Sequence, residues 1–211
     1  MLFRSAINQV VYNGEFVPGN QWVNPEHPYY QKAYPVRTRD IAKAKALLKE
    51  AGVTGPVTVD LMVPKNVERE TVAQVIQSMA AEAGFDLKIR VTELATALKQ
   101  AEAGEFQAFI LDWSGRTDPD GNAYIFQKTK APQNYSAYSN PDVDKALDDA
   151  RLVTDMAQRK SIYEKMTKSI LEDEPIIYLY HRKNLIAHTT KLGGYRAMPD
   201  GLVRVVGLKL Q

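Results

Sequence analysis

The chain has 211 residues, of which 45% are hydrophobic and 25% charged, a composition that suits one globular domain with a substantial core. The net charge is +2, and basic residues are interspersed with acidic ones, so the basic face of a nucleic-acid-binding protein is missing. The absence of cysteine excludes thiolate catalysis, disulfides and cysteine-ligated zinc. No window approaches the roughly 18 apolar residues of a membrane span, and the first residues lack the pattern of an export signal.

The N-terminal part of the chain predicts two helices separated by a long loop. Residues 5–12 have a short helical pattern, and residues 16–35 are rich in proline, asparagine and aromatic residues without a period. We expect that stretch to be ordered, because segments that bury nothing rarely hold several aromatic residues together. Apolar residues at spacings of three and four then predict an amphipathic helix over 39–51, closed by Gly52.

An alternation of strand and helix patterns follows. Apolar and polar residues alternate in two short runs, which indicates strands with one buried face, and a third run is hydrophobic enough to be a central strand. The predicted order is strand 57–63, helix 67–83, strand 85–91, helix 94–103 and strand 106–113. This order predicts an α/β sheet wound by right-handed crossovers.

The C-terminal part predicts more helices and a tail. Residues 114–122 form a loop rich in Gly, Pro, Asp and Asn, followed by a short helical piece near Tyr124. Further helices, an apolar strand and a tail are expected at 140–153, 155–172, 176–180 and 183–211. The tail contains two strand-like runs, 185–187 and 202–210, and we interpret it as an extension of the core.

The loop that directly follows the third predicted strand carries three candidate ligand-binding residues, Trp113, Arg116 and Asp118. Loops at the carboxyl ends of strands form the ligand crevice in open α/β sheets. An indole offers an apolar wall, a guanidinium can clamp a carboxylate through two hydrogen bonds, and an aspartate can accept from an ammonium group. The alternative is that 118–122 is a tight turn and Arg116 is solvated.

The same loop imitates a calcium site through Asp118, Asp120 and Asn122. The sixth position is Ala123 instead of glycine and the twelfth is Thr129 instead of glutamate, so we expect no metal here, and no cofactor elsewhere.

A second loop offers Asn134, Tyr135 and Tyr138, whose neutral polar groups and aromatic faces suit ligand amides or, alternatively, a capped loop. Trp22, in the irregular N-terminal loop, is a further candidate ligand contact.

Signs of catalysis are few. The three histidines are not at ligand spacing, and no serine elbow, phosphate loop or glycine fingerprint appears. Asp118 and Asp120 could transfer protons in a hydrolase, although turn carboxylates are usually solvated. We therefore expect a protein without catalytic activity, and the alternatives are a hydrolase using this pair or an interaction module without a small ligand.

Several segments, taken in order, resemble one protein family. Residues 39–52 read RDIAKAKALLKEAG, an acidic residue before a Lys-Ala-Leu-Leu run closed by Ala-Gly. The later segments are the strand and loop 106–122, the Asn-Tyr and Tyr-Ser-Asn-Pro region 134–151, the helix and Pro-Ile-Ile-Tyr-Leu-Tyr-His region 159–181, Gly-Tyr at 194–195 and Pro-Asp-Gly at 199–201. This ordered set resembles the dipeptide/oligopeptide-binding family of extracytoplasmic solute-binding proteins.

The resemblance implies a periplasmic-binding-protein-like (type II) α/β lobe with a mixed sheet flanked by helices. Residues 1–182 would form the C-terminal lobe of a two-lobed clamshell, and residues 183–211 the tail that returns to a missing first lobe. It further implies a periplasmic protein, cut here from a longer precursor with an export signal, that hands a peptide-like solute to the membrane permease of an ABC importer. Exposed apolar residues of the tail would favour self-association of the isolated chain.

One departure from the family bears on the ligand. Well-known dipeptide and oligopeptide binders have an aspartate three residues after the tryptophan of this loop, and here that position is Arg116. Ser-Gly-Arg followed by Asp-Pro-Asp-Gly-Asn is more similar to members assigned to glutathione or related small peptides. The resemblance therefore implies that Arg116 clamps a ligand carboxylate and that Asp118 orients the arginine or takes a ligand amine.

Overall fold

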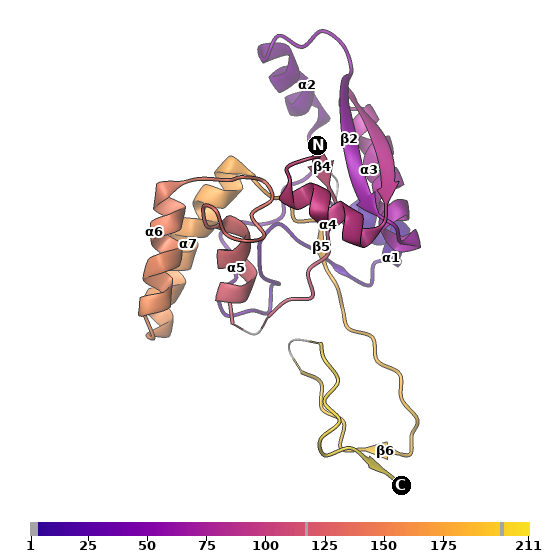
Figure 1. The fold of residues 1–211 in the computed structure, drawn as a ribbon, viewed down its shortest axis with the longest axis vertical. Helices are drawn as coiled ribbons and strands as arrows, with labels where there is room; N and C mark the ends of the chain where they lie inside the picture. The colour runs from indigo at the N-terminus through magenta and orange to yellow at the C-terminus, as the bar shows by residue number, and fades with distance from the viewer. Residues whose placement is uncertain (1–3, 117, 199–200) are drawn as a thin grey trace.

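The computed structural model describes residues 4–116, 118–198 and 201–211. Its body consists of two groups of elements (Figure 1): a parallel sheet with its helices, and three further helices. A tail leaves the body and extends away from both groups.

Strand β2 (Val57–Pro64) is the middle one of three parallel strands in the order β3-β2-β4. It pairs with β3 (Phe85–Thr92) along its whole length, and on the other side with the short β4 (Ala108–Phe109). Parallel strands need crossover connections, and helices supply them here as the alternating pattern of the sequence predicts.

Helices cover both faces of this sheet. α3 (Val67–Ala81) connects β2 to β3 and packs on one face with α1 (Arg4–Tyr12), whereas α4 (Leu94–Glu102) connects β3 to β4 and packs on the other. Successive β2 side chains point to opposite faces, so Leu61 and Met62 belong to different clusters. The first cluster contains Ile7, Leu61, Val63, Val72, Ala73, Ile76, Met79, Ala80 and Leu87, and the second Met62, Ala97 and Ala101.

The second group consists of α5 (Asp120–Gln127), α6 (Pro141–Leu152) and α7 (Met156–Asp173). The side chains of Asn140 and Asp155 accept backbone N–H groups at the starts of α6 and α7, which satisfies donors that the helices leave open. The long N-terminal loop packs against these helices, and the shared cluster contains Trp22, Val23, Tyr29, Ala123, Val143, Leu147, Ala150, Tyr163, Met166 and Ile170.

Helix α2 (Ile41–Glu50) forms where the sequence predicts it, with the Asp40 side chain capping its start. None of its residues is buried, although its apolar positions lie on one face. Figure 1 shows α2 at the edge of the body, and Arg39 attaches its start to α3 by donating to the carbonyl of Met79 at 2.6 Å.

Two distant segments meet beside the body. β1 (Val17–Pro18) and β5 (Tyr180–His181) form an antiparallel pair, after which the tail begins. Within the tail, β6 (Leu192–Gly193) and β7 (Lys209–Leu210) form a second antiparallel pair. Within the described residues no helix has both the length and the apolar character that a membrane crossing requires.

The α/β class and the order of elements through β3 and α4 are confirmed, but four strand predictions are wrong in length or in existence. β4 spans only Ala108–Phe109 and lies at an edge of the described sheet. The rest of the predicted run does not pair as a strand: after Phe109 it forms one further backbone hydrogen bond to β2, from the Ile110 N–H to the Met62 carbonyl. The run 176–180 pairs only at Tyr180. In the tail, 185–187 forms no strand, and 202–210 forms one only at its end.

Candidate functional site

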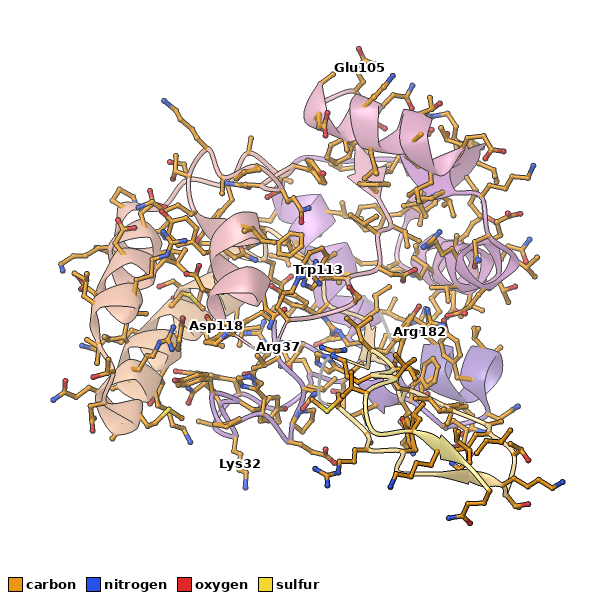
Figure 2. The ribbon with its side chains drawn as sticks, turned by 60° about the horizontal axis from the view of Figure 1, so that its bottom comes forward. Lys32, Arg37, Glu105, Trp113, Asp118 and Arg182 are labelled. Carbon is orange, nitrogen blue, oxygen red and sulfur yellow. The ribbon has the colours of Figure 1, made fainter. Side chains whose placement is uncertain are left out.

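The loop between β4 and α5 brings Trp113, Arg116 and Asp118 to the carboxyl end of the parallel sheet, as predicted. Trp113 and Asp118 can be followed in Figure 2, which turns forward the side from which the tail leaves. Thr117, between them, lies outside the described residues.

The side chain of Asn122 holds this loop in shape. Its Oδ1 accepts the Trp113 indole N–H at 3.0 Å and the Arg116 backbone N–H at 2.7 Å, and its Nδ2 donates to the Arg116 carbonyl at 2.7 Å. Asn122 is only 8% exposed, so these bonds are shielded from water. The sequence suggested this asparagine only as part of an imitation calcium loop, and no local signal marks its role.

Arg116 lies over the indole ring of Trp113. The guanidinium carbon is 4.2 Å from the ring centre, a cation-π geometry, and Nη1 donates to the Gly115 carbonyl at 2.6 Å and to Ser114 Oγ at 3.1 Å. Gly121 makes room for this side chain, since a Cβ there would lie 2.8 Å from Arg116 Cγ. Trp113 remains 36% exposed, so the arginine and the indole face solvent together.

Among the described residues, Asp118 forms no hydrogen bond or ion pair with Arg116. Its Oδ1 accepts the backbone N–H of Asp120 at 2.8 Å and lies 3.7 Å from Nη2 of Arg159 on α7. Asp120 in turn accepts two hydrogen bonds from Arg151, at 2.7 and 2.8 Å. Both carboxylates of the hydrolase alternative are thus engaged with arginines. No motif or spacing in the sequence singles out either arginine.

The second loop uses its polar groups internally. Asn134 Nδ2 donates to the carbonyls of Lys128 and Tyr138, and its Oδ1 accepts the Tyr138 backbone N–H. Tyr138 Oη donates to Asp173 at 2.6 Å, and burial together with this carboxylate raises the pKa of Tyr138. Tyr135 packs toward the sheet, with its ring 6.3 Å from that of Phe109. Within the described part of the chain, none of the three forms a hydrogen bond or ring contact with Trp113 or Arg116.

Trp22 lies in the core. It is 7% exposed, its ring centre is 4.9 Å from that of Tyr163, and its indole N–H donates to Thr167 Oγ1 at 3.1 Å. An indole gains most when its apolar rings are buried and its N–H has a partner, and both conditions are met here. The structure therefore separates Trp22 from the exposed pair of Trp113 and Arg116.

Across residues 4–116, 118–198 and 201–211, no group of three or more His, Cys, Asp or Glu side chains is arranged to hold a metal ion. The apparent calcium ligands Asp118 and Asp120 instead form the ion pairs described above.

The chain is similar to bacterial solute-binding proteins over most of its length. The family model "Bacterial extracellular solute-binding proteins, family 5 Middle" matches residues 4–135. The dipeptide-binding protein of Escherichia coli is 29% identical over 207 residues, which cover 94% of this chain and 39% of that protein. The glutathione-binding protein GsiB of Pectobacterium atrosepticum is 30% identical over 212 residues, which cover 94% of this chain and 41% of that protein.

Solved structures of binding proteins are also similar to this chain. The periplasmic binding protein DppA of Helicobacter pylori in complex with the peptide STSA has a TM-score of 0.84 and 27% identity, and the match covers 98% of this chain and 43% of that one. The oligopeptide-binding protein AppA of Bacillus subtilis in complex with a nonapeptide has a TM-score of 0.80 and 26% identity, over 100% of this chain and 45% of that one. The chain thus spans about two fifths of the length of these relatives. Because the family model matches most of its residues and the solved structures cover nearly all of them, the chain belongs to the family 5 bacterial extracellular solute-binding proteins.

Proposed function

We propose that this chain is one lobe of a periplasmic protein that captures a peptide-like solute, a small peptide or a glutathione-like anion, for an ABC importer. The solute is held between this lobe and a second one, and the closed form is presented to the permease in the membrane. No chemical step is involved. The names of the relatives support this class, since they bind dipeptides, oligopeptides and glutathione.

The exposed pair of Arg116 and Trp113 is the observation that carries the proposal. The guanidinium has one nitrogen engaged with Ser114 and Gly115, and the described residues place no carboxylate on it. A planar guanidinium in this state can donate two parallel hydrogen bonds to a ligand carboxylate. Because Asn122 fixes both the indole and the Arg116 backbone, little ordering remains to be done when the ligand binds.

The tail supports the requirement for a second lobe. Apolar side chains of this segment are largely exposed, among them Leu185, Leu202, Val205 and Val206. Soluble proteins rarely leave contiguous apolar surface uncovered, so we assign residues 183–211 to an interface with the first lobe, and residues up to 182 to the lobe described here.

Isothermal titration calorimetry of the full-length, two-lobed protein tests the proposal. Arg116→Glu should weaken the binding of small anionic peptides by about 30-fold or more, since removing one partner of a shielded charge pair costs about 2 to 5 kcal/mol. The isolated chain, with one wall of the cleft, should bind in the millimolar range or not at all.

Lys49→Glu is the matched control, because Lys49 is an exposed residue of α2, away from the loop. Equal affinity of the Arg116→Glu and parent proteins would rule out the arginine clamp. Absence of any ligand-dependent rise in melting temperature would favour an interaction module without a small ligand.

A further inference from the structure

Arg159, near the start of α7, contacts Asp118 of the loop between β4 and α5. Its side chain is 18% exposed, and its guanidinium lies 5.7 and 5.6 Å from the ring centres of Tyr29 and Tyr163. Its Nε is buried without a hydrogen-bond partner among the described residues. The ion pair that the structure gives it is with Asp118, at 3.7 Å from Nη2 to Oδ1.

The charges around the loop are therefore distributed unequally. Arg151 pairs with Asp120 through two short hydrogen bonds, and Arg159 pairs with Asp118. The polar partners that the structure gives Arg116 are neutral: Ser114 Oγ and the Gly115 carbonyl. Asp118 and Asp120 thus each pair with an arginine of α7 or α6, and Asp112 of the same loop pairs with Arg69 of α3 at 2.6 Å. Among the described residues no carboxylate lies on Arg116, which is exposed.

We propose that Arg159 is a positioning residue that gives the site its preference for an anionic ligand group, because it neutralises Asp118. This inference rests on the proposed function. Asp118 is two residues from Arg116 and its side chain is 66% exposed, so without Arg159 it presents an uncompensated negative charge beside the clamp. That charge repels a carboxylate and attracts an ammonium group, and the effect grows when closure removes water from the site.

The test compares two probes that differ in one charge, trialanine with a free C-terminal carboxylate and trialanine amide. Calorimetry at pH 7 on the full-length protein should show the parent preferring the free acid. Arg159→Met should lower the ratio of the two affinities about tenfold, and Arg159→Lys should retain most of the preference. Adding Asp118→Asn to the Arg159→Met protein should restore the ratio, since it removes the charge that Arg159 no longer neutralises.

The double variant separates a charge effect from a packing effect. Lys160→Met removes the same charge from the neighbouring position of α7, where the side chain is exposed, and should leave the ratio unchanged. If Arg159→Met weakens both probes equally, or if Asp118→Asn does not restore the ratio, the inference is wrong and Arg159 is only a packing residue. A parent that binds neither probe, or binds both alike, would instead overturn the proposed function and this inference with it.

Discussion

At the scale of single residues, the candidate site depends on an asparagine whose polar atoms bond to the loop itself. Asn122 joins the indole of Trp113 to the backbone of Arg116, and it lies in the first turn of α5, which packs through Ala123 into the cluster shared by the N-terminal loop and helices α5, α6 and α7. Asn122 thereby connects the loop of Trp113 and Arg116 to a helix that is anchored in the hydrophobic core. A buried side chain with three such bonds transmits the position of a helix to a loop.

Replacing Asn122 with alanine should therefore affect binding more than the fold. It removes the bonds to the Trp113 N–H and to both backbone groups of Arg116, and leaves these partly buried groups without their partner at a cost of at most about 1 kcal/mol each, because water can reach them once the side chain is gone. We expect peptide affinity of the full-length protein to fall about tenfold or more, with a drop of a few degrees in melting temperature. An unchanged affinity, measured by calorimetry, would show that the loop keeps its shape without this side chain.

At the scale of elements, the β1–β5 pair contains a buried histidine whose protonation at low pH destabilises the fold. His181 packs its ring against Gly19, where a Cβ would lie 2.7 Å from it, and its Nε2 is buried without a hydrogen-bond partner in the described structure. Burial lowers the pKa of His181 to about 4. The folded state therefore favours the neutral form of the ring, and protonation of His181 favours unfolding.

Stability should accordingly decrease as the pH falls through this window. Since the folded pKa lies below the unfolded value of about 6.5, the contribution of His181 is complete above pH 6.5 and is lost progressively toward pH 4, up to about 3 kcal/mol. Urea unfolding of the chain at pH 7 and pH 4.5 measures this loss. His181→Leu should lose clearly less stability than the parent over the same interval, and an equal loss in both proteins would assign the acid sensitivity to other groups.

The periodic elements could be predicted from the sequence because their residues repeat the geometry of a helix or a strand. β2, α3, β3 and α4 agree with the predicted ranges to within two residues or so at each end. The length of β4 could not be predicted, because a hydrophobic run such as 106–113 can be buried by packing without pairing as a strand. The exposed face of α2 could not be predicted either, since a helical pattern says that a face is apolar and does not say what covers it.

The candidate site was predictable only in part. Trp113, Arg116 and Asp118 lie at or just after the end of the strand predicted over 106–113, so their position beyond the carboxyl end of β4 could be deduced. The bonds of Asn122 and the pairing of Asp118 with Arg159 depend on contacts across the loop and from a distant helix. Trp22 was ambiguous because an aromatic residue in an irregular loop suits a core as well as a ligand, and here the core cluster takes it.

At the scale of the whole molecule, the tail decides how this chain behaves in solution by itself. Val205 and Val206 are 74% and 92% exposed, and they lie in a segment of many exposed apolar residues. We expect the isolated chain to associate with itself as its concentration rises, which size-exclusion chromatography with light scattering would show. Replacing both valines with serine should shift the chain toward the monomer. Val67→Ser, at an 83% exposed position on α3, serves as a control and should change nothing. A parent that stays monomeric at all concentrations would contradict this expectation.

The antiparallel pairing of Val17–Pro18 with Tyr180–His181 also has a mechanical meaning. Tension applied to the tail reaches this ladder before it reaches the longer β2–β3 ladder, because the tail begins where β5 ends. Two residue pairs resist a load far less than eight do. Pulled by its C-terminal end in an optical trap, the chain should therefore release the β5 end as an early, low-force step and leave the β2–β3 ladder to rupture later.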